Sequence, residues 1–166
     1  MLSILLISGN SKVAEELSTI LLSRYRILTA EEISEAVRIL SSAPVDVIFI
    51  DSNQKSGDSI DCLNRIKSAY SDIPVLFIIN DPASPVKKQA MQYGAYSIIA
   101  RPFDAEAIEF LLDKAIENQR LTRELKYFRV RELQEGIRKD SSKTKRDNEN
   151  ISALNWEVLR KLSKAI

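Results

Sequence analysis

The stretch VDVIFIDSNQKSGDSIDCLNRIK, residues 45–67, holds the pattern that decides the fold. It opens with an apolar run, 45–50, which is typical of a buried strand and ends at an acidic residue, Asp51. A polar loop follows, and apolar residues then recur at the spacing of an amphipathic helix. A carboxylate at the carboxyl end of a buried strand lies where open α/β sheets bind ligands. Asp51 is therefore the first candidate for a functional residue.

Four further apolar runs lie on either side of this stretch. Each is short and continuous, which is typical of strands covered on both faces. Apolar residues recur at helical spacing between the runs, so strands and helices alternate along the chain. We therefore expect an α/β fold, a doubly wound five-stranded parallel sheet over residues 1–120 with an extended C-terminal helix. The four runs are 3–8, 25–30, 73–79 and 95–100.

The sequence after residue 120 divides into three parts. Residues 121–138 extend the last helix, and an apolar stripe predicts a coiled-coil-like pairing with a second copy; a helix folded back on its own domain is the alternative. Residues 139–150 carry no apolar side chain and predict a flexible polar linker. Residues 151–166 are amphipathic again, which favours a docking helix or the start of a truncated downstream domain. The stripe consists of Ile108, Leu112, Ala115, Leu121, Leu125, Phe128 and Leu133.

Composition excludes several classes of function. The 166 residues contain no histidine, which removes histidine-based catalysis and most transition-metal sites. There is no glycine-rich phosphate loop and no nucleophile–base pair, so we expect no enzyme. A single cysteine, Cys62, excludes an internal disulfide, which suits a reducing cytoplasm, and we interpret it as core filler. No apolar run is long enough to span a membrane. Residues 120–146 carry ten basic and four acidic side chains, for which a solvated helix is favoured over nucleic-acid binding.

Three stretches carry a resemblance to a known family: VDVIFID (45–51), IPVLFII (73–79) and QYGAYSIIARPFDAEAI (92–108). Over residues 3–120 the sequence resembles the CheY-like receiver domain of bacterial two-component response regulators. The resemblance places Asp51 at the phosphoacceptor position. It also implies an acidic pair that helps Asp51 to hold Mg²⁺, a hydroxyl and a lysine that bind the phosphoryl group, and an aromatic switch residue.

This sequence departs from that pattern at nearly every helper position. Ser8 and Gly9 stand where the family has the acidic pair, and Ile79 stands at the hydroxyl position. Ile98 replaces the switch aromatic, and Arg101 replaces the lysine. Lys55 replaces a proline that is usual in the loop. We expect no cofactor, since Mg²⁺ at Asp51 would be weakly held, and we expect the arginine to pair with Asp51 instead. The site-position equivalents are Ser8, Gly9, Asn10, Asn53, Ile79 and Arg101, and the switch-position equivalent is Ile98.

These observations predict an atypical receiver domain in phosphorelay signal transduction. It would act mainly as a regulatory and dimerisation module, with vestigial or weak phosphorylation at Asp51. One alternative is a functional phosphoacceptor that is modified slowly on Asp51, and a second is a DNA-associated regulator that uses the basic helical tail. Expected partners are a second copy through the last helices, a histidine kinase and a downstream signalling domain. LRKLSKAI (159–166) resembles the helical lead-in to PAS domains, which predicts the N-terminal part of a larger signalling protein.

Overall fold

The computed structural model describes residues 1–54 and 58–164, without the side chains of 148, 150–155 and 162–164. Strands and helices alternate along the chain, as the apolar runs predict. The strands are β1 (Leu2–Ile7), β2 (Tyr25–Ala30), β3 (Val47–Asp51), β4 (Val75–Ile79) and β5 (Ser97–Ala100). The helices are α1 (Ser11–Leu21), α2 (Ile33–Ser42), α3 (Ser59–Ala69), α4 (Val86–Gln92) and α5 (Ala105–Lys164).

The five strands form one parallel sheet in the order β2-β1-β3-β4-β5. This confirms the predicted doubly wound α/β fold with a long C-terminal helix. Backbone hydrogen bonds continue the ladder one residue beyond several strands: the N–H of Ser8 donates to the carbonyl of Ala30 at 3.0 Å, and that of Arg101 to the carbonyl of Ile79 at 2.9 Å. The residues that follow the strands are thereby fixed at one edge of the sheet.

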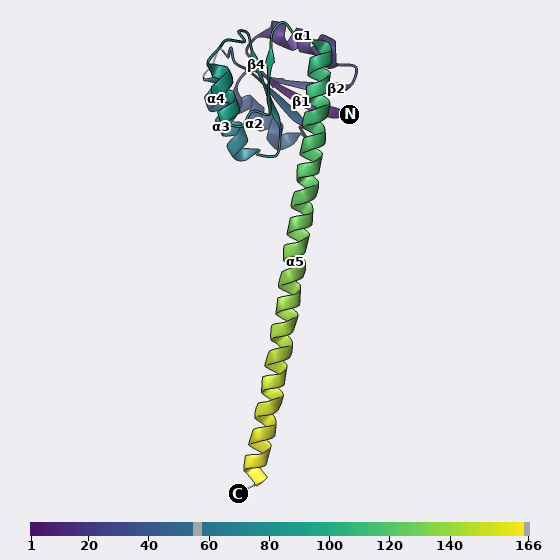
Figure 1. Ribbon diagram of the computed structural model, residues 1–166, viewed down its shortest axis with the longest axis vertical. Helices are drawn as coiled ribbons and strands as arrows, with labels where there is room; N and C mark the ends of the chain where they lie inside the picture. Colours follow the sequence, from purple (N-terminus) through teal and green to yellow (C-terminus); the bar gives the residue numbers. More distant parts are fainter. Residues whose placement is uncertain (55–57, 165–166) are drawn as a thin grey trace. The chain divides into compact units, whose positions relative to one another are not determined.

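Helices cover both faces of the sheet (Figure 1), and each face carries its own hydrophobic layer. On one face, buried side chains of α1 and of the first turns of α5 pack around Phe49. On the other face, α2, α3 and α4 pack around Phe77, and Cys62 of α3 belongs to this layer. Burial raises the pKa of the Cys62 thiol, which agrees with its predicted role as core filler. Every strand residue of β3 and β4 is buried, as the continuous apolar runs predict.

The chain separates into two compact units, Met1–Thr122 and Arg123–Ile166. In the first unit, one side of α5 is buried on the sheet through residues 108, 112, 115 and 119. Leu121 follows Gln119 by two residues, a rotation of about 200° around the helix, and its side chain is 52% exposed. The predicted single stripe is therefore wrong: Ile108, Leu112 and Ala115 belong to the core of the domain, whereas Leu121 points away from it.

The second unit is helical throughout its described residues. The predicted flexible linker at 139–150 is wrong as secondary structure, because α5 continues through it. The segment contains no glycine or proline that would end a helix. Two of its hydroxyls bond to carbonyls within the helix: Ser142 Oγ to Lys139 at 2.8 Å, and Thr144 Oγ1 to Asp140 at 3.0 Å. A downstream domain beginning at 151–166 stays a prediction. None of the described helices is long and apolar enough to cross a membrane.

Candidate functional site

Asp51 is the last residue of β3, and its side chain lies in the interior with 1% exposed. Its Oδ2 accepts a hydrogen bond from the hydroxyl of Ser8 at 2.7 Å. Its Oδ1 accepts from the backbone N–H of Asn53 at 2.9 Å. Removing a carboxylate from water is costly unless donors replace the lost solvent. Here one donor on each oxygen offsets that cost.

The β1–α1 connection supplies one of these donors. Ser8 follows β1, and its hydroxyl oxygen also accepts the N–H of Asn10 at 3.1 Å, which orients the hydroxyl. The Asn10 side chain is the N-cap of α1 and accepts the N–H of Lys12 at 3.1 Å. Gly9 lies between them without a side chain. Of these three site positions, Ser8 is the one whose side chain hydrogen-bonds to Asp51, while the side-chain oxygen of Asn10 caps the helix.

Arg101 lies elsewhere. It follows β5, and its guanidinium forms an ion pair with Glu16 of α1. The same guanidinium lies 5.6 Å from the centre of the Phe103 ring, within the range of a cation–π contact. The predicted pairing of Arg101 with Asp51 is therefore wrong. Both oxygens of Asp51 already have neutral donors, and Glu16 offers the cation a partner on the α1 side.

The remaining predicted positions are apolar or peripheral. Ile79, at the hydroxyl position, is the last residue of β4 and is 1% exposed in the core. Ile98, at the switch position, is partly buried against the layer around Phe77. Asn53 contributes its backbone N–H and has an exposed side chain. Lys55 lies outside the described residues.

The donor set does not fit Mg²⁺. This cation prefers octahedral oxygen coordination that includes carboxylates. At the β1 end the positions of the acidic pair hold Ser8, whose hydroxyl donates to Asp51, and Gly9, which offers no side chain. Across the described residues, no group of three or more acidic, histidine or cysteine side chains could hold a metal ion.

Two hollows flank the site. One, of about 820 Å³, lies beside the β1–α1 connection and is lined by Ser8, Asn10 and the acidic start of α2. The other, of about 630 Å³, lies between α1 and the β5–α5 turn. The second is lined by the Glu16–Arg101 pair, with Ile20, Pro102 and Phe103 as its apolar walls. Sequence reasoning missed Glu16, because an acidic residue on the outside of a helix carries no signal of its partner.

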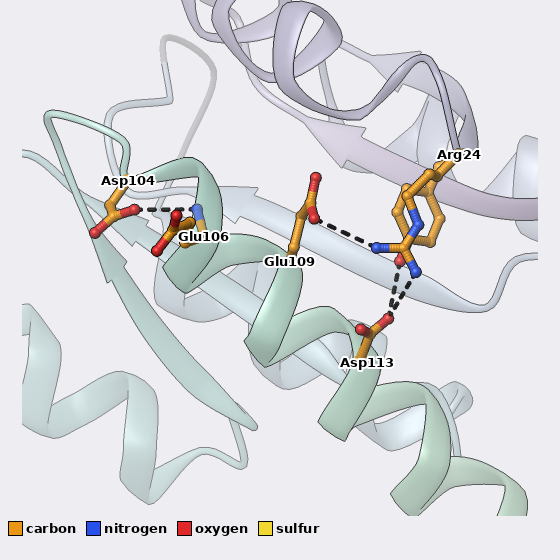
Figure 2. Close-up of polar contacts among 6 residues, drawn as sticks. Arg24, Asp104, Glu106, Glu109 and Asp113 are labelled. Carbon is orange, nitrogen blue, oxygen red and sulfur yellow. Dashed lines mark hydrogen bonds and ion pairs between the residues drawn. The ribbon is translucent and has the colours of Figure 1, made fainter.

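A further polar cluster joins the start of β2 to the first turns of α5 (Figure 2). The guanidinium of Arg24 pairs with Glu109 at 3.4 Å and with Asp113 at 3.3 Å. The Tyr25 hydroxyl bonds to Asp113 at 3.3 Å, and burial is the main cause that raises the pKa of Tyr25. Asp104 caps α5 by accepting the N–H of Glu106 at 3.0 Å.

A family model described as the response regulator receiver domain matches residues 4–113, which form the sheet, its covering helices and the start of α5. The chain belongs to the response regulator receiver domain family. This receiver resembles the regulatory protein VirG of Agrobacterium tumefaciens, with 33% identity over 88 residues, covering 52% of the receiver chain and 32% of VirG. The nitrogen assimilation regulatory protein NtrX of Azorhizobium caulinodans is 28% identical over 113 residues, covering 67% and 24% of the two chains.

Solved structures agree on the fold. NtrX from Brucella abortus in complex with ADP superimposes on the receiver with a TM-score of 0.70 at 23% identity, covering 78% of this chain and 29% of NtrX. The signal receiver domain of an HD domain-containing protein from Pseudomonas fluorescens gives 0.69 at 24% identity, covering 74% and 92%. The chain thus spans about a third or less of the length of VirG and of both NtrX proteins, whereas it spans nearly all of an isolated receiver domain.

Proposed function

We propose that this receiver is an atypical one, a regulatory and dimerisation module of a phosphorelay protein in which Asp51 is impaired as a phosphoacceptor. The observation that carries the proposal is the hydrogen bond from the Ser8 hydroxyl to Asp51 Oδ2 at 2.7 Å. It occupies the acceptor carboxylate with a neutral donor from the position where the resemblance implies an acidic residue.

The chemistry of phosphoryl transfer supports this proposal. An attacking carboxylate must reach the phosphorus and is a weaker nucleophile when its oxygens accept hydrogen bonds, and the transferring group needs positive charge around its own oxygens. Both Asp51 oxygens already accept hydrogen bonds, and the side chain is 1% exposed. Ile79 offers no hydroxyl, and the Arg101 cation is paired with Glu16. Each helper that the family supplies is thus missing or directed elsewhere.

Intact mass after incubation of the full chain with acetyl phosphate and Mg²⁺ tests the proposal. We expect at most a trace of phosphoryl adduct on the wild type and none on Asp51→Asn. Circular dichroism of both proteins shows that they are folded. A substantial adduct that is lost in Asp51→Asn would contradict the proposal and favour the alternative, a functional phosphoacceptor that is modified slowly.

The dimerisation part of the proposal rests on exposed apolar side chains in the second unit. Leu125, Phe128 and Leu133 are 62%, 58% and 67% exposed, which is unusual for residues of this size unless a partner covers them. A second copy of the same helix is the partner that the long helical segment fits best. Sedimentation velocity should detect a dimer in the wild type and a monomer in Leu125→Glu/Phe128→Glu. A monomeric wild type at high concentration would contradict this part.

A histidine kinase as the upstream partner and a further domain as the downstream partner are part of the same proposal. Membership of the receiver domain family supports the kinase, and the greater length of the relatives supports the downstream domain. No enzymatic activity and a cytoplasmic location are proposed with it, the latter from the single buried Cys62.

A further inference from the structure

Two contacts hold the Arg101 side chain on the α1 side of the sheet. Its guanidinium pairs with the carboxylate of Glu16, and it lies over the ring of Phe103 at 5.6 Å. Phe103 in turn packs against the hydrophobic layer formed by α1 and α5. Only 24% of the Arg101 side chain is exposed, compared with 43% for Glu16. The cation is therefore fixed in one orientation rather than free in solvent.

The backbone position of Arg101 would also allow a different orientation. Arg101 follows β5 and Asp51 ends β3, and β4 lies between these strands. Two strand spacings separate the backbones by roughly 10 Å, which an extended arginine and an aspartate side chain bridge together. A cation at this edge would stabilise negative charge gathered at Asp51. The contacts with Glu16 and Phe103 direct it away from that place.

We propose that Glu16 is a positioning residue that holds Arg101 on α1 and so keeps the Arg101 cation away from the Asp51 carboxylate. The inference extends the proposed function by naming the residue that withholds the positive charge. It depends on that function only in treating Asp51 as the acceptor. When Glu16 is replaced by Gln, Arg101 loses its ion pair and keeps at most a neutral hydrogen bond to the amide oxygen and the contact with Phe103.

The test compares Glu16→Gln with Glu15→Gln in the full chain. Both residues are exposed on α1, and both substitutions remove one negative charge, so Glu15→Gln controls for net charge and helix effects. The first readout is the nuclear magnetic resonance signal of the Arg101 Nε–Hε group, assigned by its loss in Arg101→Lys. We expect Glu16→Gln to move this signal and Glu15→Gln to leave it unchanged.

The second readout is the phosphoryl adduct formed with acetyl phosphate, with and without Mg²⁺. In this reaction an oxygen of Asp51 bonds to phosphorus, the bond between phosphorus and the acetyl oxygen breaks, and acetate leaves with that electron pair. In the same short incubation, before the yield levels off, we expect Glu16→Gln to form about tenfold more adduct than the wild type, which corresponds to a barrier lower by about 1.4 kcal/mol. Glu15→Gln should match the wild type, and Glu16→Gln/Asp51→Asn should form no adduct.

An Arg101 signal that stays in place in Glu16→Gln would overturn the proposal, because Glu16 would then not position the cation. A moved signal with an unchanged adduct yield, including no adduct in either protein, would overturn it as well, because the orientation would have no effect on Asp51. Substantial adduct on the wild type itself contradicts the proposed function instead. The two failures are thus separated by the proteins in which they occur.

Discussion

The hydrogen bond between Ser8 and Asp51 makes a quantitative prediction about folding. Ser8→Ala removes a donor at 2.7 Å from a carboxylate that is 1% exposed. A hydrogen bond to a charged group contributes about 1.5–3 kcal/mol. The same hydroxyl also accepts the N–H of Asn10 at 3.1 Å, a bond between neutral groups in a half-buried loop. We therefore expect Ser8→Ala to lower the free energy of unfolding by about 2 kcal/mol.

A double-mutant cycle separates the contribution of the bond from Ser8 to the Asp51 carboxylate from that of the bond between Ser8 and Asn10 in the loop. In the Asp51→Asn background the acceptor is neutral, so Ser8→Ala should cost about 1 kcal/mol less there than in the wild type. Amide hydrogen exchange of β3 is the suitable assay, since it reports opening of the domain that contains the pair. Ser3→Ala, another buried serine of the same sheet, is the matched control and should cost less than about 1 kcal/mol.

Two results would contradict this role of the Ser8 hydroxyl. If Ser8→Ala stayed within about 0.5 kcal/mol of the wild type, the hydroxyl would contribute no net stability. If Ser8→Ala had the same cost in both backgrounds, the contribution would come from the Asn10 loop and not from the buried carboxylate. In either case, protein donors would not be what compensates the buried Asp51 carboxylate for its lost solvent.

Three further predictions follow from the packing and charges of the same domain. Leu112→Ala should lower the free energy of unfolding by about 2–5 kcal/mol in urea titrations, since Leu112 is fully buried between α5 and the sheet. Arg24→Gln should cost less than about 1 kcal/mol, and less still in molar salt, because its ion pairs with Glu109 and Asp113 are half exposed. Burial raises the pKa of Tyr25, so the folded state retains the phenol proton more tightly than the unfolded state. Stability should therefore fall as pH rises above about 10, and Tyr25→Phe should remove that part of the decline.

The fold could be predicted because its information is local. Each strand is a continuous apolar run, and each crossover helix shows its own period, so the order of elements follows from the sequence. The edge at which Ser8, Asp51 and Arg101 lie also follows, because parallel strands bring their carboxyl ends together. The partners of these residues were harder to predict. Arg101 can pair with Asp51 or with Glu16, and the sequence pattern draws attention to Asp51 alone.

The helical tail shows a different limit. A run of polar residues without glycine or proline is compatible with both a solvated helix and a flexible linker, so composition at 139–150 did not distinguish the two. The single apolar stripe predicted for α5 is wrong because its residues lie on two different sides of the helix. Residues 108, 112 and 115 are buried in the core of the domain, whereas the side chains of Leu121 and Leu125 are exposed.

The Ser8–Asp51 hydrogen bond affects how receiver sequences are classified. An aspartate at the end of β3 is commonly taken as the mark of a relay protein. Here the residue has a structural role of its own, because it receives a hydroxyl of the β1–α1 connection and the N–H of the following loop. A carboxylate held in this way contributes to folding whether or not it accepts a phosphoryl group. The residue after β1 is therefore the more informative one to inspect when a genome is surveyed for phosphorelay components.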